Sequence, residues 1–170
     1  MEILVVISFV IYLMYNIISL NSFGVPHSLS NTYYLWNGVR QGTGYMFSVT
    51  LGLIAALLLP AWLEMGADSP WQFLSFLTCG SLLFVAAAPN FKSIGVESTV
   101  HTVAAILAAV CAMLWIIIVA DLWVIILLTL MYVMIVAVSH GSLKSGYIYW
   151  LETIAFLSMY FSIFLTYFCS

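Results

Sequence analysis

Few side chains in this sequence could bind a ligand or carry a proton. Its 170 residues include three histidines, six acidic residues and three basic residues. The candidates for a ligand or proton site are Glu152, His101, His140, His27 and Glu97. Glu152 is the most informative of them, because it lies inside a long apolar stretch. If that stretch crosses a membrane, an ionisable residue within it is expected to face protein or water and to mark a functional site.

These residue types suit several chemistries. Histidine and carboxylate are good metal ligands, yet no HxxxH or HExxH spacing occurs, and no GxSxG or Walker pattern is present. Both lysines lie in connections, which disfavours a retinal Schiff base. Serine nucleophiles cannot be told from helix-packing serines in a sequence. We expect no cofactor and no metal, and an intramembrane enzyme or metalloprotein that uses His101, His140 and Glu152 stays open as an alternative.

The composition indicates what kind of fold must position these residues. Hydrophobic residues make up 65% of the chain and charged residues only 5%, with a mean hydropathy of +1.19. Soluble domains carry about 25% charged and about 45–50% apolar residues. The lipid bilayer is therefore the expected surrounding, and the net charge of −3 offers no basic surface for nucleic acid.

The apolar stretches predict an all-α fold, a polytopic integral membrane protein with a bundle of six transmembrane helices. The whole chain, 1–170, forms a single transmembrane domain. The apolar run 100–139 would make a helix of about 60 Å, twice the thickness of the hydrocarbon layer, so it must turn back at Asp121. The connection 21–44 is polar yet aromatic, which favours an ordered loop on the membrane surface. The expected helices are about 2–20, 45–63, 71–88, 100–120, 122–139 and 147–168.

Six spans place both termini on the same side of the membrane. The three basic residues, Arg40, Lys92 and Lys144, then all lie in connections on the opposite side. Positively charged loops are usually cytoplasmic. The sequence therefore predicts that both termini are non-cytoplasmic.

The same topology gathers the histidines near the basic side. Two helix faces point to a pocket there, 101/105/108/112 with small residues after His101, and 152/155/159/162/166 beginning at Glu152. Our hypothesis is a pocket that contains both His101 and Glu152, with the 21–44 loop as its lid. Its carboxyl should be neutral at pH 7 unless a protonated His101 or a bound cation pairs with it. The alternative is structural: interfacial histidines, and a Glu152 that is hydrogen-bonded to a neighbouring helix.

The leading functional prediction is a non-enzymatic multi-pass protein that binds a lipid or small amphipathic ligand, or that serves as a membrane subunit. A proton-coupled small-molecule carrier, with Glu152 as its titrating group and His101 as its relay, is the second. Partners would then be the bilayer, such a ligand, and a homo-oligomer or membrane complex.

One family resembles this pattern. Six helices, a long first loop with Ser30-Asn31-Thr32, and Val100-His101 opening a helix of small residues resemble the damage-regulated autophagy modulators and related bacterial six-helix membrane proteins of unknown function. The resemblance implies a lipid-associated or trafficking role without established chemistry. It would also place the first loop on the non-cytoplasmic side, opposite to the side that the basic residues indicate.

Overall fold

The computed structural model describes residues 2–140 and 146–169, without the side chains of residues 139, 140, 168 and 169. Every regular element in this part of the chain is an α-helix, as the apolar stretches predict. Seven helices follow one another, α1 (Glu2–Phe23), α2 (Thr32–Val39), α3 (Tyr45–Met65), α4 (Phe73–Ala87), α5 (Val96–Ile118), α6 (Trp123–His140) and α7 (Tyr147–Cys169).

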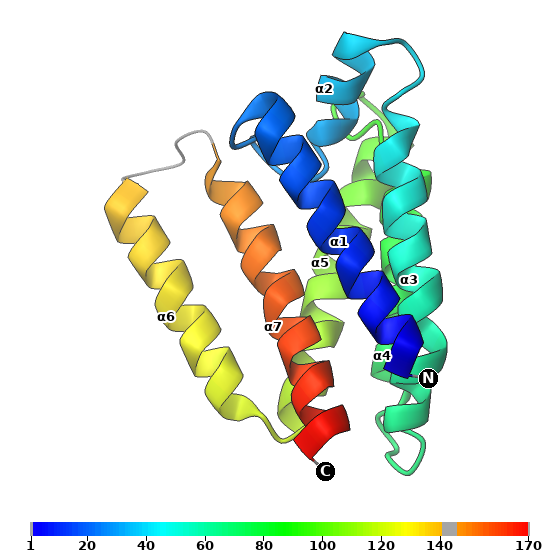
Figure 1. Ribbon diagram of the computed structural model, residues 1–170, viewed down its shortest axis with the longest axis vertical. Coiled ribbons are helices and arrows are strands. Elements are labelled where there is room, and N and C mark those ends of the chain that lie inside the picture. The colour runs from blue at the N-terminus through cyan, green and yellow to red at the C-terminus, as the bar shows by residue number, and fades with distance from the viewer. Residues whose placement is uncertain (1, 141–145, 170) are drawn as a thin grey trace.

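The long helices lie roughly side by side in one bundle (Figure 1). α4 packs between α3 and α5, α1 packs on α3, and α7 contacts α5, α3 and α6. α6 is the outermost helix and leans away at one edge. The beginning of α1 and the end of α7 lie at the same end of the bundle, while α2 lies at the opposite end (Figure 1). The side of the membrane on which the termini lie stays a prediction.

Apolar side chains cover the outside of the bundle, and polar side chains are buried inside it. Large apolar side chains are exposed on the outside of the helices, for example Phe84 at 62% and Met134 at 63%. Serine, threonine, asparagine and histidine side chains are buried between them, including Ser8, Asn16 and Thr78. Four helices are long and apolar enough to cross a membrane, Glu2–Phe23, Tyr45–Met65, Val96–Ile118 and Tyr147–Tyr167. These features indicate a multi-pass integral membrane protein.

The 21–44 connection contains a helix that the sequence analysis treats as loop. α2 begins at Thr32 and ends at Val39, and the side chain of Trp36 packs edge-on against Phe23 at the end of α1, with 4.8 Å between ring centroids. The turn before it is closed by main-chain hydrogen bonds from Asn31 to Ser28 and from Thr32 to Leu29, both of 3.1 Å. This connection is therefore ordered and docked on the bundle.

The helix ends lie within three residues of the expected bounds, except at the start of α5. α5 begins at Val96, four residues early, because Gly95 precedes it with φ +149, a backbone conformation that L side chains rarely adopt. The chain does turn back at Asp121, but the backbone of this residue makes the turn. Asp121 takes the left-handed conformation with φ +54, and Leu122 N donates to Ile116 O at 3.0 Å. That pairing satisfies a carbonyl at the end of α5.

Candidate functional site

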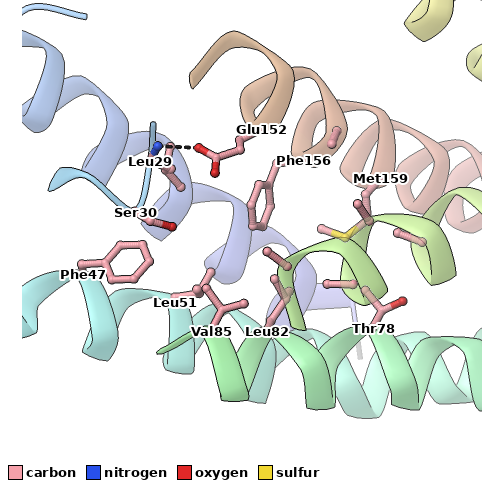
Figure 2. Close-up of a pocket in the computed structure, with 15 residues that line it drawn as sticks. Leu29, Ser30, Phe47, Leu51, Thr78, Leu82, Val85, Glu152, Phe156 and Met159 are labelled. Atoms are coloured by element: carbon pink, nitrogen blue, oxygen red, sulfur yellow. Dashed lines mark hydrogen bonds between the residues drawn. The ribbon is translucent and has the colours of Figure 1, made fainter. Parts of the chain in front are cut away.

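A cavity lies inside the bundle between α3, α4, α5 and α7 (Figure 2). Its volume is about 100 Å³, and its wall is almost entirely apolar. The residues that line it are Leu29, Ser30, Phe47, Leu51, Thr78, Leu82, Val85, Ala105, Ala108, Ala109, Ala112, Glu152, Ala155, Phe156 and Met159. Leu29 and Ser30 come from the connection before α2, so this connection covers one end of the cavity.

The alanine face of α5 forms one wall of the cavity. Ala105, Ala108 and Ala112 belong to the stripe that the sequence analysis places on one helix face, and all three line the cavity. On the opposite helix, Glu152, Ala155 and Met159 of the second stripe line it as well. Small side chains on one helix leave room that the facing helix does not fill. The cavity therefore follows from residue size at helical spacing.

Glu152 is the ionisable residue in the lining of this cavity. It lies five residues, about 7–8 Å, after the start of α7, and its Oε2 accepts a hydrogen bond of 2.5 Å from Leu29 N. The other carboxyl oxygen points toward the cavity interior (Figure 2). The side chain is half-buried, and the described residues provide it with no cationic partner. Glu152 thus connects the cavity to the main chain of the covering connection.

The covering connection is anchored at several other points. Thr32 Oγ1 donates to Leu29 O at 2.5 Å and pairs with Tyr15 Oη of α1 at 2.5 Å. Tyr149 N, near the start of α7, donates to His27 O at 3.1 Å. These bonds join residues 27–32, which we name the cap segment, to both α1 and α7.

His101 holds the same segment from the other side. Its Nδ1 lies 2.7 Å from Ala88 O, and its Nε2 lies 3.0 Å from Ser30 Oγ. A carbonyl oxygen only accepts, so Nδ1 carries the proton of a neutral ring, and Nε2 then accepts from the Ser30 hydroxyl. The ring is 5% exposed and stacks on Phe91 with 5.0 Å between ring centroids. His101 itself does not line the cavity, but its partner Ser30 does.

The two central residues of the pocket hypothesis therefore meet through the cap segment. Leu29 N donates to Glu152 of α7, and Ser30 Oγ is hydrogen-bonded to His101 of α5. Two neighbouring residues of the cap segment are thus each bonded to a different helix. Leu29 and Ser30 are the site residues that the sequence analysis misses. Their only sequence signal is a serine-rich stretch before a helix, and a main-chain N–H carries no signal of its own.

The remaining candidates lie apart from the cavity. Glu97 Oε1 accepts from Asn90 N at 3.0 Å, which ties the start of α5 to the connection before it. The side chain of His27 is exposed, and only its carbonyl takes part in the cap segment. His140 ends α6, and its side chain lies outside the described residues.

Of the basic residues used for the orientation, two are described. Arg40 is exposed just after α2, and Lys92 Nζ donates to Asn31 Oδ1 at 2.6 Å while lying 4.7 Å from the centroid of the Tyr34 ring. Tyr34 Oη in turn donates to Asn90 Oδ1 at 2.8 Å. Arg40 and Lys92 both lie at the α2 end of the bundle. Lys144 falls outside the described part.

Few polar groups line the cavity. Among the described side chains, which do not include those of His140 and Cys169, no group of three histidine, cysteine, aspartate or glutamate residues could hold a metal ion. What the cavity offers is the carboxyl of Glu152 and the hydroxyls of Ser30 and Thr78 in an otherwise apolar lining. Compared with known proteins, the chain matches no family model, no curated protein and no solved structure at a significant level.

Proposed function

We propose that this chain is a multi-pass membrane protein that binds a small amphipathic ligand in the cavity beneath the cap segment. The observation that supports it is the lining: an apolar space inside the bundle with a carboxyl oxygen of Glu152 facing into it. The alanine wall of α5 and the side chains of Phe156 and Met159 suit an alkyl or aromatic body. A carboxyl oxygen accepts hydrogen bonds, so the polar head of the ligand should be a donor, such as an amine or a hydroxyl.

The volume limits the size of this ligand. Drug-sized ligands occupy pockets of about 300–1,000 Å³, and an engineered cavity of about 150 Å³ takes up benzene. The cavity of about 100 Å³ is smaller than either, but it is not enclosed, so a short chain can extend past its opening. A short amphiphile fits, whereas a phospholipid would have to leave most of its chain outside.

We also propose that six helices cross the membrane, with α2 lying at the surface. α4 has 15 residues and α6 has 18, which correspond to about 22 Å and about 27 Å against a hydrocarbon layer of about 30 Å. The turn at Ser69–Gln72 continues α4 with main-chain bonds such as Gln72 N to Ser69 O at 3.1 Å. Arg40 and Lys92 favour a cytoplasmic α2 end, and hence non-cytoplasmic termini.

A proton-coupled carrier is the second candidate, and one observation favours it. Glu152 faces the cavity and also holds the main chain of the segment that covers it. Protonation of the carboxyl would weaken a charge-assisted bond to Leu29 N and so couple proton binding to the cover of the cavity. Loss of proton-driven uptake in E152Q, with normal folding, would support this candidate.

The binding proposal can be tested with hexylamine, hexanol and hexanoate as probes of equal chain length. The full chain is purified in a mild detergent, and its thermal unfolding is followed at equal probe concentrations. Hexylamine and hexanol should raise the Tm of the wild type more than hexanoate does, because hexanoate brings a second carboxyl to Glu152. E152Q should remove most of the preference for the amine.

A matched control comes from Glu97, which also accepts a hydrogen bond from a main-chain N–H but lies outside the cavity. E97Q should respond to the three probes as the wild type does. The same Tm increase with hexylamine in E152Q as in the wild type would contradict the proposal, since the effect would then come from micelles or from another site.

A further inference from the structure

Ser30 and His101 have the geometry of a nucleophile and its base. Ser30 Oγ lies 3.0 Å from His101 Nε2, within the reach of about 2.6–3.2 Å that proton transfer between such groups needs. The two residues are 71 positions apart, so tertiary packing brings them together. The Ser30 side chain lines the cavity and points into it (Figure 2). The hydroxyl thus faces both a base and the proposed binding space.

The base is oriented by a third group, as a catalytic histidine requires. Nδ1 donates to Ala88 O at 2.7 Å, which fixes the tautomer in which Nε2 is free to accept a proton. In hydrolases with a catalytic triad a carboxylate occupies this place, whereas here a carbonyl at the end of α4 does. The stacked ring of Phe91 holds the imidazole plane. The histidine is therefore ready to accept the proton of Ser30.

Main-chain donors adjoin the hydroxyl. The Leu29 N–H holds a carboxyl oxygen of Glu152, which shows that this donor can bind an oxygen at the end of the cavity. The main-chain N–H of Ser30 makes no main-chain hydrogen bond within the described residues. The N–H of a nucleophile and that of a nearby residue form the oxyanion hole in known serine enzymes.

We propose that the cavity is an acyl-transfer site, in which Ser30 is the nucleophile and His101 the general base for short-chain acyl esters. The proposal rests on the proposed function in one respect, because the same cavity must admit a small ligand. The carbonyl carbon of the ester would lie at Ser30, and its short acyl chain against the alanine wall of α5.

The reaction balances with water as the only co-reactant. Ser30 Oγ forms a bond to the ester carbonyl carbon while Nε2 of His101 takes the hydroxyl proton. The tetrahedral intermediate then breaks its bond to the alcohol oxygen, which leaves with that proton from Nε2. Water attacks the acyl-serine with its proton going to Nε2. The acyl–Oγ bond breaks, and Nε2 returns the proton to Oγ. The products are an alcohol and a carboxylic acid.

The Ser30 N–H and the Leu29 N–H would hold the carbonyl oxygen of the intermediate. Since the Leu29 N–H donates to Glu152, the carbonyl oxygen has to displace this carboxyl. Glu152 is therefore a positioning residue that keeps the cap segment in place until a substrate enters.

The test uses a fluorophosphonate probe on the full chain in mild detergent. Attack by Ser30 Oγ would form an O–P bond, release fluoride and give the hydroxyl proton to His101. Peptide mass spectrometry should locate the adduct on Ser30, and S30A should not be labelled. H101Q should label about 10²–10⁴-fold more slowly. Release of p-nitrophenolate from p-nitrophenyl acetate should be lost in S30A as well.

The control variant is S28A, which removes a hydroxyl of the same cap segment that accepts from Asn31 N at 3.0 Å and is not bonded to His101. S28A should be labelled on Ser30 at a rate close to that of the wild type. Because H101Q removes a buried side chain, its thermal unfolding is measured too. If it does not fold, the adduct site in the wild type and the S30A result decide.

Two outcomes separate this inference from the binding proposal. No adduct on Ser30 in a wild-type protein that hexylamine still stabilises would overturn the acyl-transfer site and leave the binding proposal intact. An adduct on Ser30 without any effect of hexylamine would support the nucleophile and contradict the proposed ligand class. Equal labelling of S30A and the wild type would also overturn the inference, since another residue would then be the nucleophile.

Discussion

Replacing Glu152 tests whether the carboxyl holds the cap segment. Its Oε2 accepts from Leu29 N across 123 positions of sequence, so the bond connects α7 to the covering connection. E152A removes the acceptor and leaves a main-chain N–H of a buried residue without a partner. E152Q keeps an amide oxygen of similar shape in its place. The two variants therefore separate the hydrogen bond from the charge.

The expected magnitudes follow from these bonds. An unsatisfied buried donor costs about 1–3 kcal/mol, so E152A should destabilise the protein by that amount. A hydrogen bond to a charged group contributes about 1.5–3 kcal/mol and a neutral one about 0.5–1.5 kcal/mol. E152Q should cost about 1 kcal/mol if the carboxyl is ionised and close to nothing if it is protonated. A loss of roughly 3–5 kcal/mol would indicate a broken buried ion pair, which the structure gives no reason to expect.

The measurement combines unfolding and hydrogen exchange. For a chain of this size, 1 kcal/mol shifts the Tm by about 2–4 °C, which a thermal scan in detergent resolves. Exchange of the peptide that contains Leu29 should accelerate in E152A and stay near the wild-type rate in E152Q. E97A is the matched control, because it removes another carboxyl acceptor from Asn90 N and should leave the Leu29 peptide unchanged.

Wild-type stability and wild-type exchange at Leu29 in E152A would refute this reasoning. The carboxyl would then face its surroundings without holding the segment, and both the carrier candidate and the positioning role would lose their basis.

W115F should lower the free energy of unfolding by no more than about 2 kcal/mol, measured by denaturant titration, because the smaller ring leaves a gap at a fully buried position beside Trp62 while the change also removes a buried indole N–H without an acceptor in the described part; a loss of about 4 kcal/mol or more would contradict the relief expected from removing that N–H. Gly146 has φ +99, and an added methyl would lie 2.8 Å from Cγ1 of Val25, just before the cap segment, so G146A should lower the Tm by the equivalent of about 1–2 kcal/mol or more; an unchanged Tm would contradict the backbone conformation before α7. In a cysteine-free background, single cysteines at Asp68 and Ala120 should react with an impermeant reagent from the same side of the membrane; reaction from opposite sides would remove the proposed crossing of α4 and α5.

Composition and periodicity alone were enough to predict that this protein is an all-α membrane protein. The fraction of apolar residues excludes a soluble fold, and the length of the 100–139 run requires a turn, which the chain makes at Asp121. The depth of Glu152 in an apolar stretch and the small residues after His101 also indicated two faces of a cavity. These features can be predicted from sequence because the hydropathy of a segment and the spacing of residues on one helix face depend only on that segment.

The partners of these residues were beyond the reach of the sequence. Glu152 binds a main-chain N–H, and every residue except proline has one. His101 binds a serine 71 positions away, and nothing in the sequence pairs that serine with this histidine. The sequence also did not predict α2. Its eight residues lie between two glycine-containing turns, and a segment this short does not show enough helical periodicity to separate a helix from an ordered loop. Only the packing of α5 and α7 against the cap segment selects Leu29 and Ser30, because the distances that matter are set by how helices pack and not by their order in the chain.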